Sequence, residues 1–79
     1  MWYYLSLSQK KMGNYLASLE ASKKVYELHP NNINNLINLS DLYRLTGHFS
    51  EAREYSEKAL SLEPENQNAK KILNFLGNI

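Results

Sequence analysis

Residues 36–64 read LINLSDLYRLTGHFSEAREYSEKALSLEP, and residues 2–30 read WYYLSLSQKKMGNYLASLEASKKVYELHP. At an offset of 34 residues the two stretches agree at both glycines, at both prolines and in the apolar positions between them. Coincidence accounts for one or two such matches, but not for the whole frame. A period of about 20–50 residues is typical of stacked-repeat architectures, which usually bind other proteins. The period therefore decides the fold more firmly than any local pattern.

Within each unit the apolar residues recur every three or four positions, as an amphipathic helix requires. In the second unit this spacing predicts one helix over 33–45 and another over 49–62, with a turn at 46–48. Gly47 stands where a left-handed residue ends the first of these helices. Pro64 ends the second, because proline disfavours a helical residue before it. Each unit is thus predicted to be a helix, a tight turn and a second helix.

The first unit and the last part of the chain follow the same plan. Helices are predicted over 2–11 and 15–28, and a third cycle begins after Pro64 with a single helix that covers the open end of the second pair. The predicted fold class is all-α, an α-solenoid of two antiparallel helix pairs plus a C-terminal capping helix. The predicted boundaries are a single domain over 1–79, with repeat 1 at about 1–32, repeat 2 at about 33–66 and the closing helix at about 67–77.

Polar residues are placed to begin the helices and to decorate their exposed faces. Asn31 and Asn32 are candidate N-caps for the helix over 33–45, and residues 65–68 repeat that role for the closing helix. His48 and Ser50 remain alternatives for the helix that follows Gly47. Two i,i+4 pairs are expected on exposed faces, Glu20 with Lys24 and Glu54 with Lys58.

Composition bounds the function. A chain of 79 residues allows one small domain with a modest core, and 43% hydrophobic with 22% charged residues is ordinary for a globular protein. The net charge of +1 gives no general attraction to nucleic acid or to an anionic membrane. Without cysteine there is no disulfide and no thiolate metal site. Residues 1–7 fit neither a signal peptide nor a membrane span, so membrane insertion is not expected. The absence of cysteine permits the cytoplasm, which is the expected location on base rates alone.

The packing frame of both units resembles that of the tetratricopeptide repeat (TPR) family, whose pattern is W-x2-L-G-x2-Y followed by A-x3-F, a later Ala and a closing Pro. The first unit supplies Trp2, Leu5, Ser6 and Gln9, then Ser18, Ser22, Val25 and Pro30, and the second supplies Leu36, Leu39, Ser40 and Tyr43, then Ala52, Ser56, Ala59 and Pro64. Small residues in this frame let helices approach closely while large ones fill the remaining space. Ser22 and Ser56 replace the family's Phe, and Gln9 replaces a Tyr, so weaker packing is expected there.

The resemblance implies a peptide-binding surface on the concave side, which the first helix of each unit lines. The positions carried over are Tyr3, Leu7, Lys10, Asn34, Ile37, Asn38, Asp41 and Arg44. Tyr3 and Arg44 are the expected anchors, because aromatic residues and arginine dominate binding hot spots. The alternative is that these residues are only the solvated and half-buried faces of the helices.

One ligand class of the family is rejected. Members that hold the C-terminal carboxylate of chaperone tails need several converging cationic and amide donors. The corresponding positions here hold Tyr3, Leu7, Asn38, Asn68 and Ile72, of which only Asn38 matches.

No catalytic, metal or cofactor site is predicted. His29 and His48 lie in different turns without an acidic or second histidine partner at ligand spacing, and no nucleophile–base–acid set or phosphate loop is found. The predicted function is a non-enzymatic module that binds a partner protein or peptide, and no nucleic-acid partner is expected. The alternative is self-association into a homo-oligomer through exposed end helices, since the aromatic run Trp2, Tyr3 and Tyr4 leaves the N-terminal end without a polar outer face.

Overall fold

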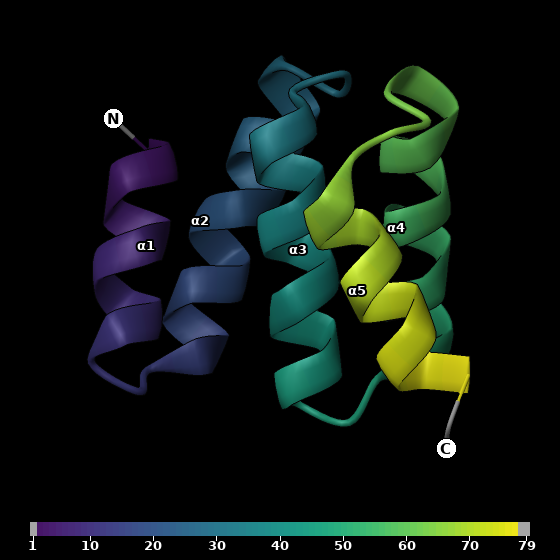
Figure 1. Ribbon diagram of the computed structural model, residues 1–79. Helices are drawn as coiled ribbons and strands as arrows, with labels where there is room; N and C mark the ends of the chain where they lie inside the picture. The colour runs from purple at the N-terminus through teal and green to yellow at the C-terminus, as the bar shows by residue number, and fades with distance from the viewer. Residues whose placement is uncertain (1, 78–79) are drawn as a thin grey trace.

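The computed structural model describes residues 2–77, and the side chains of Leu5 and of residues 7–77. Five helices follow one another along the chain (Figure 1). Their bounds are α1 Trp2–Lys11, α2 Tyr15–Leu28, α3 Ile33–Leu45, α4 Phe49–Leu62 and α5 Gln67–Gly77. The described residues contain no strand, so the predicted all-α class is confirmed. The packing roles expected for the side chains of Trp2 and Ser6 lie outside the described residues.

Two glycine turns close the first helix of each pair. Gly13 and Gly47 have φ angles of 81° and 82°, in the left-handed region that only glycine adopts without strain. At the second turn the N–H of Gly47 donates to the carbonyl of Arg44 at 3.2 Å, and the N–H of His48 donates to that of Tyr43 at 2.7 Å. This is the Schellman arrangement, which satisfies carbonyls left open at a helix end. The same pair of bonds surrounds Gly13, so both turns are built alike.

The helix starts divide into two kinds. Asn32 accepts a hydrogen bond from the N–H of Asn35 at 3.2 Å, and Asn66 accepts one from the N–H of Ala69 at 2.9 Å. These are side-chain caps at the starts of α3 and α5. Asn14 and His48 precede α2 and α4 without a side-chain capping bond. The starts after the two proline-containing turns are therefore fixed by side chains, and those after the glycine turns by the turn itself.

Each helix packs on its neighbours in the chain, and α3 also contacts both α1 and α5. Of the three first helices of the successive cycles, α3 thus contacts the other two, and α5 lies beside α3 and against α4 (Figure 1). Leu36, Leu39 and Leu42 of α3 are almost completely buried and form the centre of the core. Residues from all of α2 to α5 pack around this helix, so α3 is the central element of the stack.

The serines that replace the family's phenylalanine are fully buried and hydrogen-bonded. Ser22 Oγ accepts from Asn38 Nδ2 at 2.6 Å, which joins α2 to α3. Ser40 Oγ donates to the carbonyl of Ala52 at 2.6 Å and also contacts Ser56 Oγ, which joins α3 to α4. These positions therefore exchange aromatic packing for polar links between closely spaced helices.

Of the two expected exposed pairs, Glu20 with Lys24 forms no ion pair among the described residues, and Lys58 interacts with the charge of Glu54 without a direct ion pair. Glu20 pairs with Lys23 and Lys24 pairs with Glu27, both at i,i+3 spacing. Lys58 instead donates to the hydroxyl of Tyr26 at 3.0 Å and lies over its ring. Spacings of three and four bring side chains equally near on a helix, so small differences in rotamer decide between them.

None of the helices in residues 2–77 combines the length and the apolar character that a membrane span requires.

Candidate functional site

A groove of about 340 Å³ opens on the side of the molecule that α1, α3 and α5 share. Its α3 wall and its α5 wall each present residues spaced three or four apart, so each wall is one helix face. The lining residues are Lys10, Ile37, Asp41, Arg44, Asn68, Lys71, Ile72 and Phe75. The groove therefore joins residues from three helices that are far apart in sequence.

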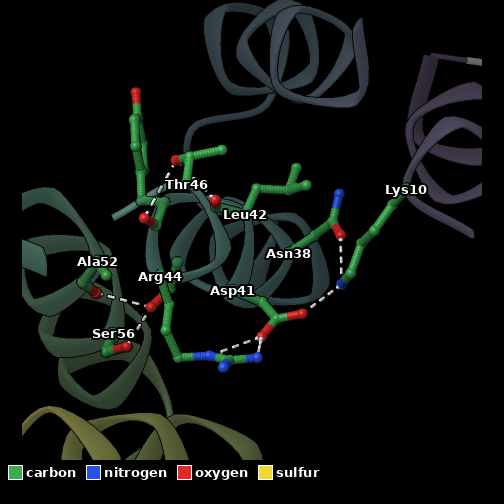
Figure 2. A network of polar contacts seen from close by, with 10 residues as sticks. Lys10, Asn38, Asp41, Leu42, Arg44, Thr46, Ala52 and Ser56 are labelled. Atoms are coloured by element: carbon green, nitrogen blue, oxygen red, sulfur yellow. Dashed lines mark hydrogen bonds and ion pairs between the residues drawn. The ribbon is translucent and has the colours of Figure 1, made fainter. Parts of the chain in front are cut away.

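Asp41 is the electrostatic centre of this groove. Its carboxylate lies 2.7 Å from Nζ of Lys10, which comes from α1, and it accepts from Nε of Arg44 at 3.1 Å and from Nη2 of the same guanidinium. Figure 2 shows the carboxylate between the two cations. Burial raises the pKa of Asp41, but the hydrogen bonds and charges of Lys10 and Arg44 outweigh it, and the pKa lies below its ordinary value. Asp41 therefore stays ionised and holds both cations in place.

The same lysine ties the groove to the interior. Lys10 Nζ also donates to Oδ1 of Asn38 at 3.1 Å (Figure 2), and the amide nitrogen of Asn38 donates to Ser22. Asn38 is only 3% exposed. It therefore positions Lys10 from below and offers almost no surface of its own.

The α5 wall adds apolar and cationic surface. The guanidinium of Arg44 lies 5.0 Å from the centre of the Phe75 ring, a cation–π contact across the groove. Phe75 is nevertheless 47% exposed, whereas Ile72 is 8% exposed. Lys71 is exposed, and no ion pair joins it to another described residue. This wall can therefore accept an apolar side chain and a negative charge.

Only some of the peptide-binding positions predicted from the sequence line the groove. Four of them, Lys10, Ile37, Asp41 and Arg44, line the groove. Asn38 lies beneath it, while exposed Asn34 and half-buried Leu7 are not part of the lining. The side chain of Tyr3 lies outside the described residues.

The lining residues on α5 were not predicted as site residues. They are Asn68, Lys71, Ile72 and Phe75, and each stands 34 residues after a predicted position, namely Asn34, Ile37, Asn38 and Asp41. The repeat offset was therefore the signal that would have found them. The sequence predicts this helix only as a cover for the second pair, and Asn68 and Ile72 enter only through the rejected chaperone-tail class.

The groove lining combines charged, amide and apolar groups. Among the described residues its lining carries ammonium, guanidinium, carboxylate, amide and apolar groups, but no hydroxyl, thiol or imidazole. Over the same part of the chain, no three His, Asp or Glu side chains are placed to hold a metal ion.

Comparison with known proteins agrees with the geometry. The family model described as "Tetratricopeptide repeat" matches residues 3–65, which cover both helix pairs. No curated protein matches the chain significantly. The helix pairs, the 34-residue offset and this match lead to one conclusion. The chain belongs to the tetratricopeptide repeat family, whose non-catalytic repeats generally mediate protein–protein interaction.

Proposed function

We propose that this chain is a non-enzymatic interaction module that binds a peptide segment of a partner protein in the groove between α1, α3 and α5. The observation that carries the proposal is the convergence of residues from three helices around one groove of about 340 Å³. The partner is a protein and not a nucleic acid, because the chain's net charge is only +1 and a carboxylate stands in the groove. No cofactor takes part.

Binding is expected to use one apolar contact and several charged ones. A peptide side chain packs against Phe75 and the edge of Ile72, while charged groups at the rim fix its orientation. Arg44 is the expected anchor on the α3 wall, since its guanidinium already lies against an exposed ring. Because Asp41 holds Arg44 and Lys10 before the peptide arrives, little side-chain entropy is lost on binding.

The test begins with a peptide selection. An extended chain advances about 3.3 Å per residue, so roughly 9 residues span the longest dimension of 29 Å. A displayed random library of about that length is selected on the immobilised protein, and the affinities of selected peptides are measured by isothermal titration calorimetry. The double variant Arg44→Ala with Phe75→Ala is expected to weaken binding at least about tenfold.

A matched control is available on α4. Arg53→Ala with Phe49→Ala removes the same two residue types, and Phe49 is 40% exposed, close to the 47% of Phe75. Binding by this control is expected to stay within about twofold of the original. Circular dichroism confirms that both variants are folded. Equal affinities for the original protein and the groove variant would show that the groove is not the binding surface.

Self-association is the second candidate, and exposed apolar residues in the first helix pair favour it. Met12 is 76% exposed, Leu16 is 72% exposed and Leu5 is 43% exposed. Light scattering on a sizing column across a range of concentrations measures the molar mass. If these residues join two copies, the protein is a dimer and Leu16→Glu returns it to the monomer. A monomer at every concentration excludes this candidate.

A further inference from the structure

Charge in the groove is unbalanced. Three cationic side chains, Lys10, Arg44 and Lys71, face one carboxylate, that of Asp41, so the groove carries a net charge of +2 while the whole chain carries +1. The excess positive charge of the molecule is therefore concentrated on this surface.

The three cationic side chains also differ in how many of their N–H donors already contact the carboxylate of Asp41. Asp41 takes one contact from Lys10 and two from Arg44, through Nε and Nη2. Nη1 of Arg44 and Nζ of Lys71 meet no acidic group among the described residues. A guanidinium has five N–H donors and an ammonium three. Donors on opposite walls of the groove thus remain available to a ligand.

Apolar surface lies between these donors. Phe75 follows Lys71 by one helical turn on α5 and is 47% exposed, and Ile37 stands on the facing wall. An ion pair beside apolar surface is less screened than one in open water. A ligand that places carboxylates on either side of an apolar side chain would meet both kinds of surface at once.

We infer that the groove binds an internal acidic segment of a partner protein, with Asp or Glu side chains on either side of an apolar residue. The apolar residue packs on Phe75 and Ile37, and the carboxylates pair with Lys71 and with the free edge of Arg44. The ligand is a run of side-chain carboxylates and not a chain terminus, because Asp41 already occupies the point where Lys10 and Arg44 converge. The remaining donors belong to Arg44 on the α3 wall and Lys71 on the α5 wall. This inference rests on the proposed function and specifies its ligand.

The first readout is the composition of the selected peptides. Asp and Glu are expected to be enriched over the starting library around an apolar position. A selected acidic peptide, made with an amidated C-terminus, is then compared with its Glu→Gln and Asp→Asn counterpart. The neutral peptide is expected to bind about tenfold more weakly, and the affinity of the acidic one is expected to fall as salt rises.

The second readout is charge reversal on the protein. Lys71→Glu is expected to lower the affinity for the acidic amidated peptide at least about tenfold. Arg53→Glu on α4 makes the same change of charge away from the groove and is expected to change the affinity less than about threefold. Lys71 is exposed and makes no ion pair with another described residue, so its variant folds, which circular dichroism verifies.

Each opposing outcome separates the two proposals. Neutral or basic peptides that lose affinity in the Arg44→Ala, Phe75→Ala variant would overturn the acidic ligand and leave peptide binding standing. Binding abolished by C-terminal amidation would replace the internal segment by a chain terminus. Selected peptides indifferent to every groove variant would overturn both proposals.

Discussion

Asp41 shows how one residue organises the surface around it. Burial alone would raise its pKa, yet contacts with Lys10 and Arg44 lower the pKa below the ordinary value of 3.8. A carboxyl group whose pKa is lower in the folded state stabilises that state when ionised. This contribution is complete above about pH 4 and is lost as pH falls through the folded-state pKa.

Replacing this carboxylate tests its part in stability. Asp41→Asn is expected to lower the free energy of unfolding by about 1–2 kcal/mol at neutral pH, because two cations lose a charged hydrogen-bond partner. Below about pH 4 the difference is expected to shrink as the original protein is protonated. Urea unfolding followed by circular dichroism measures both, with Glu57→Gln on the exposed face of α4 as control. A difference that is constant down to about pH 2 would contradict the assignment.

Substitution of Ser56 tests whether the buried serine positions leave room for a larger side chain or are already closely packed. It is 0% exposed, and its hydroxyl contacts that of Ser40. Ser56→Phe, which restores the family's residue, is therefore expected to destabilise by about 2 kcal/mol or more through overpacking. Ser56→Ala loses only a hydrogen bond and is expected to cost about 1 kcal/mol. A more stable Phe variant would mean that space for a ring remains there.

At the residue scale, the sequence pointed to the α3 face of the groove but not to its connections. Ile37, Asp41 and Arg44 follow one helix face, so the resemblance to the repeat family is enough to select them. The pairing of Asp41 with Lys10 depends on how closely α1 approaches α3, and a sequence pattern contains no such distance. The burial of Asn38 under Lys10 was hidden for the same reason.

At the scale of elements, local signals specify the helices. The glycine turns, the two prolines and the caps all lie at helix ends, which is why the five bounds were predictable. The contribution of α5 to the groove is harder to predict. Its apolar stripe indicates that one face is buried, but it does not indicate what the other edge of the helix contacts. That edge, with Lys71 and Phe75, becomes a wall of the groove only when α5 lies beside α3.

Helix capping gives the prediction that belongs to this scale. Asn32→Ala and Asn66→Ala are each expected to cost about 1 kcal/mol, because each removes an acceptor from a backbone N–H at a helix start. Asn14→Ala is the matched control, since Asn14 occupies the same place before α2 without a capping bond, and is expected to cost clearly less. Thermal and urea unfolding compare the three variants. Equal losses would show that capping does not distinguish these positions.

At the scale of the whole molecule, each first helix contributes residues to one groove. The 34-residue offset carries positions of α3 onto α5, so the repeat generates the groove as well as the stack. The chemistry differs between the α3 and α5 walls. At the 34-residue offset, Lys71 occupies the position equivalent to Ile37, and Phe75 occupies the position equivalent to Asp41. This divergence between repeats is what gives the groove its excess of positive charge.

The central claim is that partners bind on the α1–α3–α5 side. The most direct measurement is a titration of the ¹⁵N-labelled protein with a selected peptide, followed by amide chemical shifts. Changes are expected to concentrate at Lys10, Asp41, Arg44 and Lys71, while Arg53 and Glu57 on α4 stay nearly unchanged. Shifts concentrated on α2 and α4, with the groove residues unaffected, would contradict the account.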